Sequence, residues 1–469
     1  MSNLVRLPLL GLVLILTGCA LGPEYQRPAT NLPEQWSVSE ADSRMQHEEW
    51  QDWWQKYQDP NLNRLVVLAL EDNLDLRLQL ARIREARARL GFTQADKLPS
   101  ISTQADAARE HQASDMTTAD RSTLNNQFAV TGMLNYELDL WGRLAREQEA
   151  AQALLEQSHF VHHALELNVI ADLVATYFDL RNAENQRRIT EATIESREET
   201  LRLEQLRYQA GQSDELSLRQ AESELQSARA QYPVQRERIR VLEGALAVLT
   251  GMSPAELMDT LSYGDTHLEA IRLPKVVPAL MPAELLQRRP DIRAVEAVLM
   301  AANASIGVAE ANRFPRFNLS ALLSSSSLDA ADLFTSGAAG WGLSAGLVGP
   351  LIDFGRNRSL VASAEAQAEQ AEIQYLSSVQ LAFNEVRDAL VIYQTSAERT
   401  TAIRLQEEAY QRTLQLAEIR YREGLIGFIE VLDAQRVLMS VQQAHSEAIR
   451  NELIASATLF KTLGGGWEG

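Results

Sequence analysis

The second half of the chain repeats the first. The segment Tyr208-Gln-Ala-Gly211, followed by Ala221, recurs as Tyr421-Arg-Glu-Gly424, followed by Ala434. Both sets of positions are 213 residues apart (421 − 208 and 434 − 221). A duplication of this length predicts two units that share one order of elements, neither of which closes a structure alone.

Each repeat contains a long stretch without glycine or proline. These stretches cover residues 143–208 and 356–423, and each predicts about 100 Å of α-helix. Short glycine-containing connections follow, so each helix should return antiparallel, over about 214–247 and about 428–463. Adding 213 maps the apolar stripe of the first helix onto the second: Ile170, Leu173, Tyr177 and Leu180 correspond to Phe383, Val386, Leu390 and Tyr393.

The first return helix contains two residues that weaken helices. Pro233 and Gly244 should kink or weaken it, whereas the second return helix has no such break. Long helices alone would also fit a coiled coil with a purely structural role, so the segments before them decide the fold class.

Alternating apolar and polar residues precede each long helix. Residues 128–140 alternate strictly, and residues 341–351 do so in the second repeat. Earlier strands are expected over about 100–109 and over 317–323. With polar loops between them, these four strands are typical of a transmembrane β-barrel.

Four strands cannot close a barrel in lipid. An open sheet leaves unpaired backbone groups there, and the smallest single-chain barrels have about eight strands. Two copies would give eight strands with a filled interior, and three would give twelve with room for an aqueous lumen. We therefore expect an oligomer in which the long helices extend the same cylinder into the periplasm.

The N-terminus predicts export and lipid attachment. Arg6 precedes an apolar run over 7–16 that is too short to span a bilayer, and Leu16-Thr17-Gly18-Cys19 follows. Cys19 is the only cysteine, so no intrachain disulfide is possible. Its position resembles a bacterial lipobox, which predicts a cleaved signal peptide and a covalent lipid on Cys19. Ala20 at the next position favours anchoring to the outer membrane of a Gram-negative cell.

Composition and motifs argue against several other classes. The formal net charge is −19, and phosphate contacts need clustered positive charge, so nucleic-acid binding is not expected. No apolar run of about 18 residues follows the signal, which predicts no transmembrane helix. His159, His162 and His163 have metal-ligand spacing but no evident carboxylate or thiolate partner, so no metal site is expected. No catalytic motif stands out, so we expect neither an enzyme nor a cofactor other than the lipid.

Short motifs cover nearly the whole mature chain. After the lipobox they are Gly22-Pro23-Glu24-Tyr25-Gln26-Arg27-Pro28, Trp50-Gln51-Asp52-Trp53-Trp54, Arg288-Arg289-Pro290-Asp291-Ile292, Phe314-Pro315, Asp353-Phe354-Gly355-Arg356 and Leu432-Asp433-Ala434-Gln435. In this order they resemble the outer membrane factors, the TolC-type exit ducts of tripartite efflux and secretion systems. The lipobox and the motif after it resemble the lipoprotein branch that serves resistance-nodulation-division efflux pumps.

The resemblance implies a fold and a function. The fold would be mixed α and β: a homotrimer with a 12-stranded transmembrane β-barrel, a long periplasmic α-helical barrel and a small equatorial domain. The function would be passive conduction of drugs or other small toxic compounds, and hence antibiotic resistance. The partners would be a periplasmic membrane-fusion adaptor and an inner-membrane proton-driven efflux pump. A duct for protein secretion, which shares this architecture, and a structural coiled-coil lipoprotein are the alternatives.

The resemblance also implies a periplasmic gate at the tip of the second repeat. Asp433 and Arg422 match an aperture aspartate and arginine, and Tyr421 matches the tyrosine position beside them. Ile429 falls where relatives often carry a gate-forming leucine. Three copies of Asp433 near one axis would repel unless each is paired with a cation such as Arg422. Both tips should also contact the adaptor, through Gly211, Ser213, Asp214, Gly424 and Leu425.

The expected division of the chain follows the repeats. In order, the segments are a signal peptide 1–18; a lipidated and partly equatorial segment 19–59; repeat 1 over 60–250, with strands at about 98–140 and a helical hairpin at 142–250; an equatorial linker 251–280; repeat 2 over 281–463, with strands at about 315–353 and a hairpin at 355–463; and a tail 464–469. The equatorial belt would use about 32–57, about 251–278 and the C-terminal end.

Overall fold

The computed structural model describes residues 20–30, 52–112, 123–260, 267–274 and 285–465. The expected signal peptide and the lipidation site Cys19 lie outside these residues. Much of the expected equatorial belt also lies outside them, namely residues 32–51, 261–266 and 275–278.

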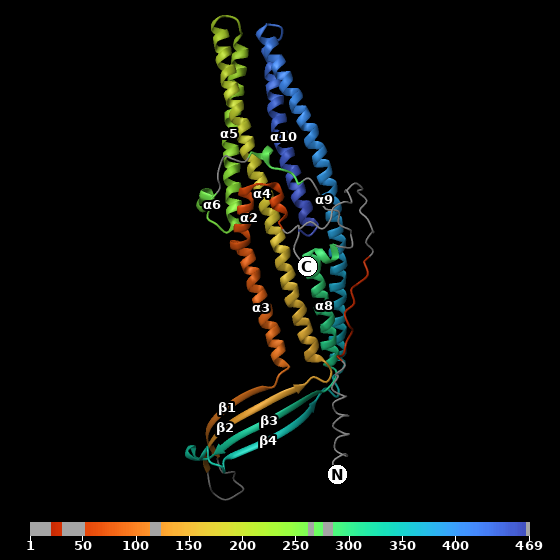
Figure 1. The fold of residues 1–469 in the computed structure, drawn as a ribbon. Helices are drawn as coiled ribbons and strands as arrows, with labels where there is room; N and C mark the ends of the chain where they lie inside the picture. Colours follow the sequence, from red (N-terminus) through yellow and green to blue (C-terminus); the bar gives the residue numbers. More distant parts are fainter. Residues whose placement is uncertain (1–19, 31–51, 113–122, 261–266, 275–284, 466–469) are drawn as a thin grey trace. The chain divides into compact units, whose positions relative to one another are not determined.

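Four antiparallel strands form one sheet in the order β1-β2-β3-β4 (Figure 1). They are β1 (Ser100–Gln112), β2 (Thr123–Leu138), β3 (Arg316–Ser327) and β4 (Ala339–Val348). The central pair joins the two repeats, with Leu138 of β2 opposite Phe317 of β3. Within the described residues, β1 and β4 each pair on one side only, so the sheet has two free edges.

Helices form most of the remaining described chain. The two longest, α4 (Arg143–Gln209) and α9 (Arg356–Arg422), are each followed by a return helix, α5 (Glu215–Thr250) and α10 (Phe428–Thr462) (Figure 1). The shorter elements are η1 (Trp53–Tyr57), α2 (Pro60–Asp72), α3 (Leu74–Asp96), α6 (Pro254–Thr260), η2 (Leu268–Ala270), α7 (Leu285–Arg288), α8 (Pro290–Ala311) and η4 (Ala330–Asp332).

Pro233 lies inside α5 without ending it. The helix runs for 36 residues, although a proline in a helix interior costs about 3 kcal/mol. Ala228 and Ile239 on either side are buried. The helix is therefore held by packing of one face, which supplies most helical stability in proteins. The helix continues through Pro233 and Gly244, and the kink or weakening expected there stays a prediction.

The compact units of the chain do not follow the repeats. Unit 1 comprises Met1–Ala29, Arg82–His159 and Ala294–Leu376, and unit 2 comprises Thr30–Ala81, Phe160–Arg293 and Ser377–Gly469. Each repeat contributes to both units because its long helix belongs partly to each. The division at residues 60–250 and 281–463 therefore describes the duplication rather than the compact units.

The main core of unit 2 is built around aromatic side chains. Trp53 stacks on Phe460 with ring centroids 5.3 Å apart, and the Tyr57 ring meets Phe178 edge-on at 5.0 Å. The Tyr57 hydroxyl lies 2.7 Å from the Ser456 hydroxyl. These rings fix η1 and the end of α10 against α4, because aromatic pairs add directional contact to their buried area.

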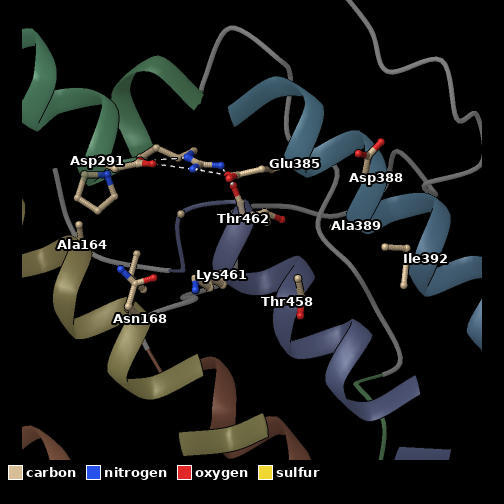
Figure 2. A pocket seen from close by; sticks show the side chains of 14 residues that line it. Ala164, Asn168, Asp291, Glu385, Asp388, Ala389, Ile392, Thr458, Lys461 and Thr462 are labelled. Carbon is tan, nitrogen blue, oxygen red and sulfur yellow. Dashed lines mark hydrogen bonds and ion pairs between the residues drawn. The ribbon is translucent and has the colours of Figure 1, made fainter. Parts of the chain in front are cut away.

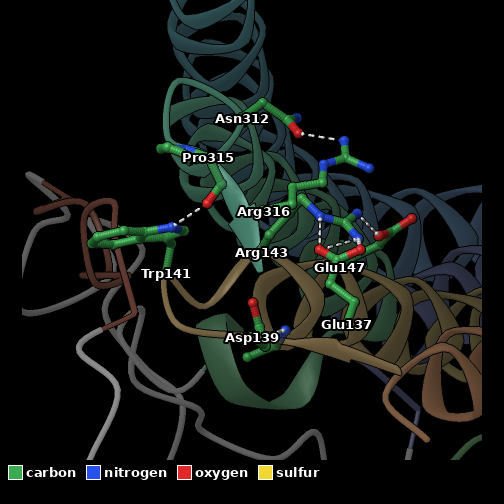
Figure 3. Close-up of polar contacts among 9 residues, drawn as sticks. Glu137, Asp139, Trp141, Arg143, Glu147, Asn312, Pro315 and Arg316 are labelled. Atoms are coloured by element: carbon green, nitrogen blue, oxygen red, sulfur yellow. Dashed lines mark hydrogen bonds and ion pairs between the residues drawn. The ribbon is translucent and has the colours of Figure 1, made fainter. Parts of the chain in front are cut away.

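The strand-to-helix junctions of unit 1 are well bonded in the first repeat (Figure 3). Trp141 Nε1 donates to the carbonyl of Pro315 over 2.8 Å, and its indole ring stacks on Phe314 with ring centroids 4.8 Å apart. Arg143, in the first turn of α4, pairs with Glu137 at 3.0 Å and with Glu147 at 3.1 Å. These contacts tie the end of β2 to the start of β3 and set the direction of α4.

The segment after the expected lipidation site packs on the helices of unit 1. The N–H of Leu21 donates to the Trp141 carbonyl (3.1 Å), and its own carbonyl accepts from Arg146 Nε (3.0 Å). Further along, Arg27 donates twice to the buried Glu296 of α8, over 2.6 and 2.9 Å. A chain anchored through Cys19 would thus be held to unit 1 from its first residues.

Among the described helices, α8 alone is long and apolar enough to cross a membrane by length and composition. Its mean hydropathy reaches 1.4 over 18 residues, and half of that window is buried. Glu296 and Asn303 interrupt its apolar residues, so the sequence has no uninterrupted apolar run there. Buried helices of protein cores meet the same criteria, and the ion pair of Glu296 with Arg27 suits a core helix.

Candidate functional site: the two helical tips

The two helical hairpins turn through the same backbone conformation. Gly211 and Gly424 have φ angles of 70° and 73°, in the left-handed region that glycine adopts without steric cost. At each turn the next N–H reaches back five residues, from Gln212 to the Arg207 carbonyl and from Leu425 to the Arg420 carbonyl. Both α4 and α9 therefore end in the same glycine-terminated motif.

The tips differ immediately after these glycines. Asp214 caps α5, with its side chain accepting from the Ser217 N–H over 2.7 Å. This bond lowers the pKa of the exposed Asp214 carboxyl. The matching position in the second repeat, 214 + 213, is Gly427, which offers α10 no side-chain cap. Polar side chains thus shape the first tip, whereas the exposed Leu425 and the half-buried Ile426 make the second more apolar.

A buried glutamate joins the two hairpins near their tips. Glu204 of α4 is fully buried and accepts the Tyr421 hydroxyl (2.7 Å) and the Ser213 hydroxyl (2.9 Å). Burial raises the pKa of Tyr421, and the hydrogen bond and charge of Glu204 raise it further. The Arg207 guanidinium lies 4.5 Å from the centre of the Tyr421 ring. Tyr421 is therefore held as a neutral donor between a carboxylate and a cation.

A second charged link between the two hairpins involves α4, α5 and α10. Glu224 of α5 pairs with Arg197 of α4 (3.1 Å) and accepts Arg436 of α10 (2.9 Å). Arg197 is nearly buried. Burial lowers its pKa, which Glu224 opposes and Arg436 reinforces. Glu224 thus bridges both hairpins between two arginines.

A groove lies beside the Glu204 link. Its volume is about 310 Å³, and it runs between α4 and the second hairpin. Its lining includes Glu199, Thr200 and Leu203 on one side and Tyr421, Arg422 and Phe428 on the other. The Phe428 side chain belongs to the apolar cluster that packs the tip with Ala221, Val431 and Leu432.

The structure separates the four residues expected to form the gate. Tyr421 turns inward to Glu204, and Arg422 lines the groove. Ile429 and Asp433 are exposed, four residues apart on one face of α10. In the described residues of a single chain, Asp433 and Arg422 do not pair; Arg422 Nε donates to the Glu418 carbonyl at 3.3 Å. The expected pairing concerned three copies of Asp433 near one axis, so the gate assignment stays a prediction.

The structure also places the residues expected to contact an adaptor. Gly211, Asp214, Gly424 and Leu425 are exposed at the turns, whereas Ser213 is half-buried and donates to Glu204. Glu204 itself was missed by the sequence analysis. The available signal was a break in the repeat, since position 204 + 213 holds Ala417 rather than a charged residue.

The histidines of α4 have a carboxylate partner after all. His162 Nε2 lies 3.4 Å from one Glu166 oxygen and His163 Nδ1 lies 3.0 Å from the other. The expectation that these histidines have no carboxylate partner is therefore wrong, because Glu166 lies one helical turn further along α4. Within the described ranges, no group of three or more His, Cys, Asp or Glu side chains has the arrangement of a metal site.

The Arg288-Arg289-Pro290-Asp291-Ile292 motif borders a second cavity, of about 370 Å³, in unit 2 (Figure 2). Arg289 donates to Asp291 (2.6 Å) and to Glu385 of α9 (2.7 Å), and to the Thr462 carbonyl at the end of α10 (3.2 Å). Burial opposes the charge on Arg289, but its carboxylate partners prevail and raise its pKa. The motif therefore joins three segments of unit 2 through one guanidinium.

Replacing Arg289 by alanine is expected to destabilise unit 2. Asp291 and Glu385 are partly exposed and would regain water, so the loss should be about 1–3 kcal/mol. Arg387→Ala, which removes an exposed pair with Asp388, should cost about 0.5 kcal/mol or less. Urea unfolding followed by circular dichroism measures both. Equal losses in the two variants would show that Arg289 is an ordinary surface residue.

Strands with two free edges, joined to long helical hairpins, are typical of a channel component of the outer membrane. The model of the family "Outer membrane efflux protein" matches residues 65–252 and 281–465. The chain belongs to this family, and it is an outer-membrane efflux channel of a Gram-negative bacterium.

Individual relatives match nearly the whole chain. The solvent efflux pump outer membrane protein SrpC of Pseudomonas putida is 34% identical over 467 residues, covering 98% of each chain. The cation efflux system protein CusC of Escherichia coli O157:H7 is 30% identical, covering 97% of each. The crystal structure of the Campylobacter jejuni CmeC outer membrane channel superposes with a TM-score of 0.89 at 26% identity, covering 96% of each chain.

Proposed function

We propose that three copies of this chain assemble into the outer-membrane exit duct of a tripartite efflux system. The observation that carries the proposal is the sheet whose outer strands, β1 and β4, lack a second neighbour in the described chain. Backbone groups at such edges need partners in lipid, so the sheet must close with other copies. Three copies give a 12-stranded barrel with an aqueous lumen, and their hairpins give a 12-helix periplasmic barrel.

The partners follow from the chemistry of the chain. The family consists of channels, so the energy for transport comes from elsewhere: an inner-membrane proton-driven pump, linked by a periplasmic adaptor. The adaptor would dock at the exposed turns around Gly211, Asp214, Gly424 and Leu425. A covalent lipid on Cys19 would anchor the chain, since residues directly after it pack on unit 1. A coiled-coil tether would need no sheet, so the four strands argue against that alternative.

The cargo is proposed as a class only. The printed names of the relatives refer to solvents in one case and to cations in another. A passive duct conducts what its pump delivers. Relatives named for different cargoes are therefore consistent with a passive duct. We propose small toxic compounds, including antibiotics, as the cargo.

The gate is proposed at the periplasmic tips. Ile429 and Asp433 share an exposed face of α10, and Arg422 is exposed beside them in sequence. In a trimer, Asp433 of one copy would pair with Arg422 of the next, which relieves the repulsion of three carboxylates near one axis. The Ile429 side chains would form the apolar part of the constriction.

Single-channel recording in planar bilayers tests the duct and its gate. The wild-type protein is expected to show a small conductance, and the double variant Arg422→Ala/Asp433→Ala a larger one, because it removes the pairs that hold the tips together. Arg412→Ala is the matched control, since Arg412 is exposed and, within the described part of the chain, bonds to Gln415 on its own helix. If purified trimers of the wild type and the double variant both fail to conduct, the protein is not a gated duct.

A further inference from the structure

The groove between α4 and the second hairpin has a volume and a lining that suit a small ligand. Its volume is about 310 Å³, at the lower end of the range for small-molecule sites, which is roughly 300–1,000 Å³. One part of its wall is apolar and consists of Leu203, Phe428 and Val431. All of its lining residues belong to unit 2, so the groove is complete within one compact unit of a single chain.

Two carboxylates of the groove have no cation partner in the described chain. Glu204 is fully buried and accepts two hydroxyl groups, but it forms no ion pair there. The Arg207 guanidinium lies over the Tyr421 ring instead. Glu418 is half-buried; its backbone carbonyl accepts from Arg422, whereas its carboxylate has no partner among the described residues. Because a buried charge is costly unless it is paired, the groove favours a cationic ligand.

An amide oxygen in the same groove needs a hydrogen-bond donor. Thr200 Oγ1 donates its one hydrogen to the Ser196 carbonyl over 2.9 Å, so toward Gln435 it can only accept. Gln435 Nε2 therefore faces Thr200, at 3.4 Å, and this fixes the orientation of the amide. Gln435 Oε1 is left buried without a hydrogen-bond partner. Buried polar atoms are almost always bonded, so a ligand with N–H groups would satisfy this oxygen.

We propose that this groove binds a small aliphatic diamine, with one ammonium group at the Glu204 carboxylate and the other at the Glu418 carboxylate. An ammonium group has three N–H donors, enough to bond both a carboxylate and the free oxygen of Gln435. The methylene chain lies on the apolar wall. Glu204 belongs to α4 and Glu418 to α9, so the bound diamine joins the two hairpins.

Titration calorimetry on the full-length protein in detergent tests the site, with 1,5-diaminopentane as the probe. The wild type is expected to bind it, whereas 1,5-pentanediol, which has the same length but no charge, should not bind measurably. Glu418→Gln should weaken binding of the diamine about tenfold or more, because it removes one charge-assisted bond. Glu423→Gln is the matched control and should bind like the wild type, since Glu423 is exposed at the same turn but does not line the groove.

A gain of binding separates the site from an effect on folding. Arg422 is the one basic residue among the described residues of the lining, and its charge opposes a dication. Arg422→Gln should therefore bind the diamine several-fold more tightly, a result that a misfolded tip would not give. The proposal is overturned if the wild type does not bind the diamine, if pentanediol binds as tightly, or if Arg422→Gln brings no gain. Equal weakening by Glu418→Gln and Glu423→Gln would also overturn it, because the diamine would then follow only the overall acidity of the chain.

The consequence for conduction rests on the proposed duct. A diamine that joins α4 to α9 favours the closed tip, so 1,5-diaminopentane added on the side of the helical tips should lower the single-channel open probability. Glu418→Gln should remove this response, whereas a block of the pore itself would persist in that variant. If calorimetry shows binding and the open probability does not change, the site stands and its effect on the gate is wrong. A complete lack of conductance would contradict the proposed duct and leave the calorimetric result standing.

Discussion

Glu204→Ala is expected to raise the open fraction of the channel more than any other single substitution at the tips. The variant removes the carboxylate that accepts the Tyr421 hydroxyl and the Ser213 hydroxyl. A buried hydrogen bond to a charged group contributes about 1.5–3 kcal/mol. Part of this remains in an opened tip that water can reach, so we expect a shift of about 1–2 kcal/mol. This corresponds to a change of about 5- to 30-fold in the ratio of open to closed channels.

Two further variants separate the roles of charge and hydrogen bond. Glu204→Gln keeps an oxygen that accepts from Tyr421 but removes the charge, so its open fraction should lie between wild type and Glu204→Ala. Tyr421→Phe should resemble Glu204→Ala, since it breaks the same link from the other side.

Glu199→Ala is the matched control for this link. Glu199 lines the same groove but pairs with Arg202 on its own helix, so its removal should leave the open fraction unchanged. Single-channel open probability at fixed voltage measures all four variants. If Glu204→Ala conducts like wild type, the link between the hairpins does not hold the tip closed.

The features that could be predicted from the sequence are those that occur in both repeats. Two alternating stretches and two glycine-terminated helices occur at the same offset, so each prediction was supported by an independent copy. The shared turn at Gly211 and Gly424 is one example. A backbone conformation with positive φ can be predicted from a glycine in the sequence, because few other residues adopt it.

Contacts between the repeats could not be predicted in this way. Glu204 binds Tyr421 across 217 positions, and Glu224 binds Arg436 across 212. Neither partner is fixed by local pattern, because such contacts depend on how two hairpins pack. The expected pair of Arg422 with Asp433 depends on several copies meeting near one axis, and it stays a prediction.

The compact units show a similar limit. A repeat found in sequence indicates common ancestry of two segments, but folding buries apolar surface wherever segments meet. Here the strands of both repeats form one sheet, and the return helices α5 and α10 of both lie in unit 2. The central β2–β3 pair, which joins the repeats, therefore could not be predicted from either repeat alone.

Asp59→Ala is expected to cause the largest loss of stability in unit 2. One Asp59 oxygen caps α2, accepting the N–H groups of Asn61 (2.9 Å) and Leu62 (3.3 Å), and the other accepts the buried Tyr177 hydroxyl (2.5 Å). Loss of a helix cap costs about 1 kcal/mol, and a buried hydroxyl without a partner costs a further ~1–3 kcal/mol. We therefore expect a total loss of about 2–4 kcal/mol.

Control variants divide this loss between its two causes. Asp214→Ala removes a cap of the same type that is exposed and lacks a tyrosine partner, so it should destabilise less. Adding Tyr177→Phe to Asp59→Ala removes the unpaired hydroxyl and should restore part of the stability, because a buried pair replaced on both sides leaves no unsatisfied group. The shift in the urea midpoint, followed by circular dichroism in detergent, measures each variant. If Asp59→Ala loses no more than Asp214→Ala, the bond to Tyr177 contributes nothing, and the core around Trp53 and Phe460 holds α2 in place by packing alone.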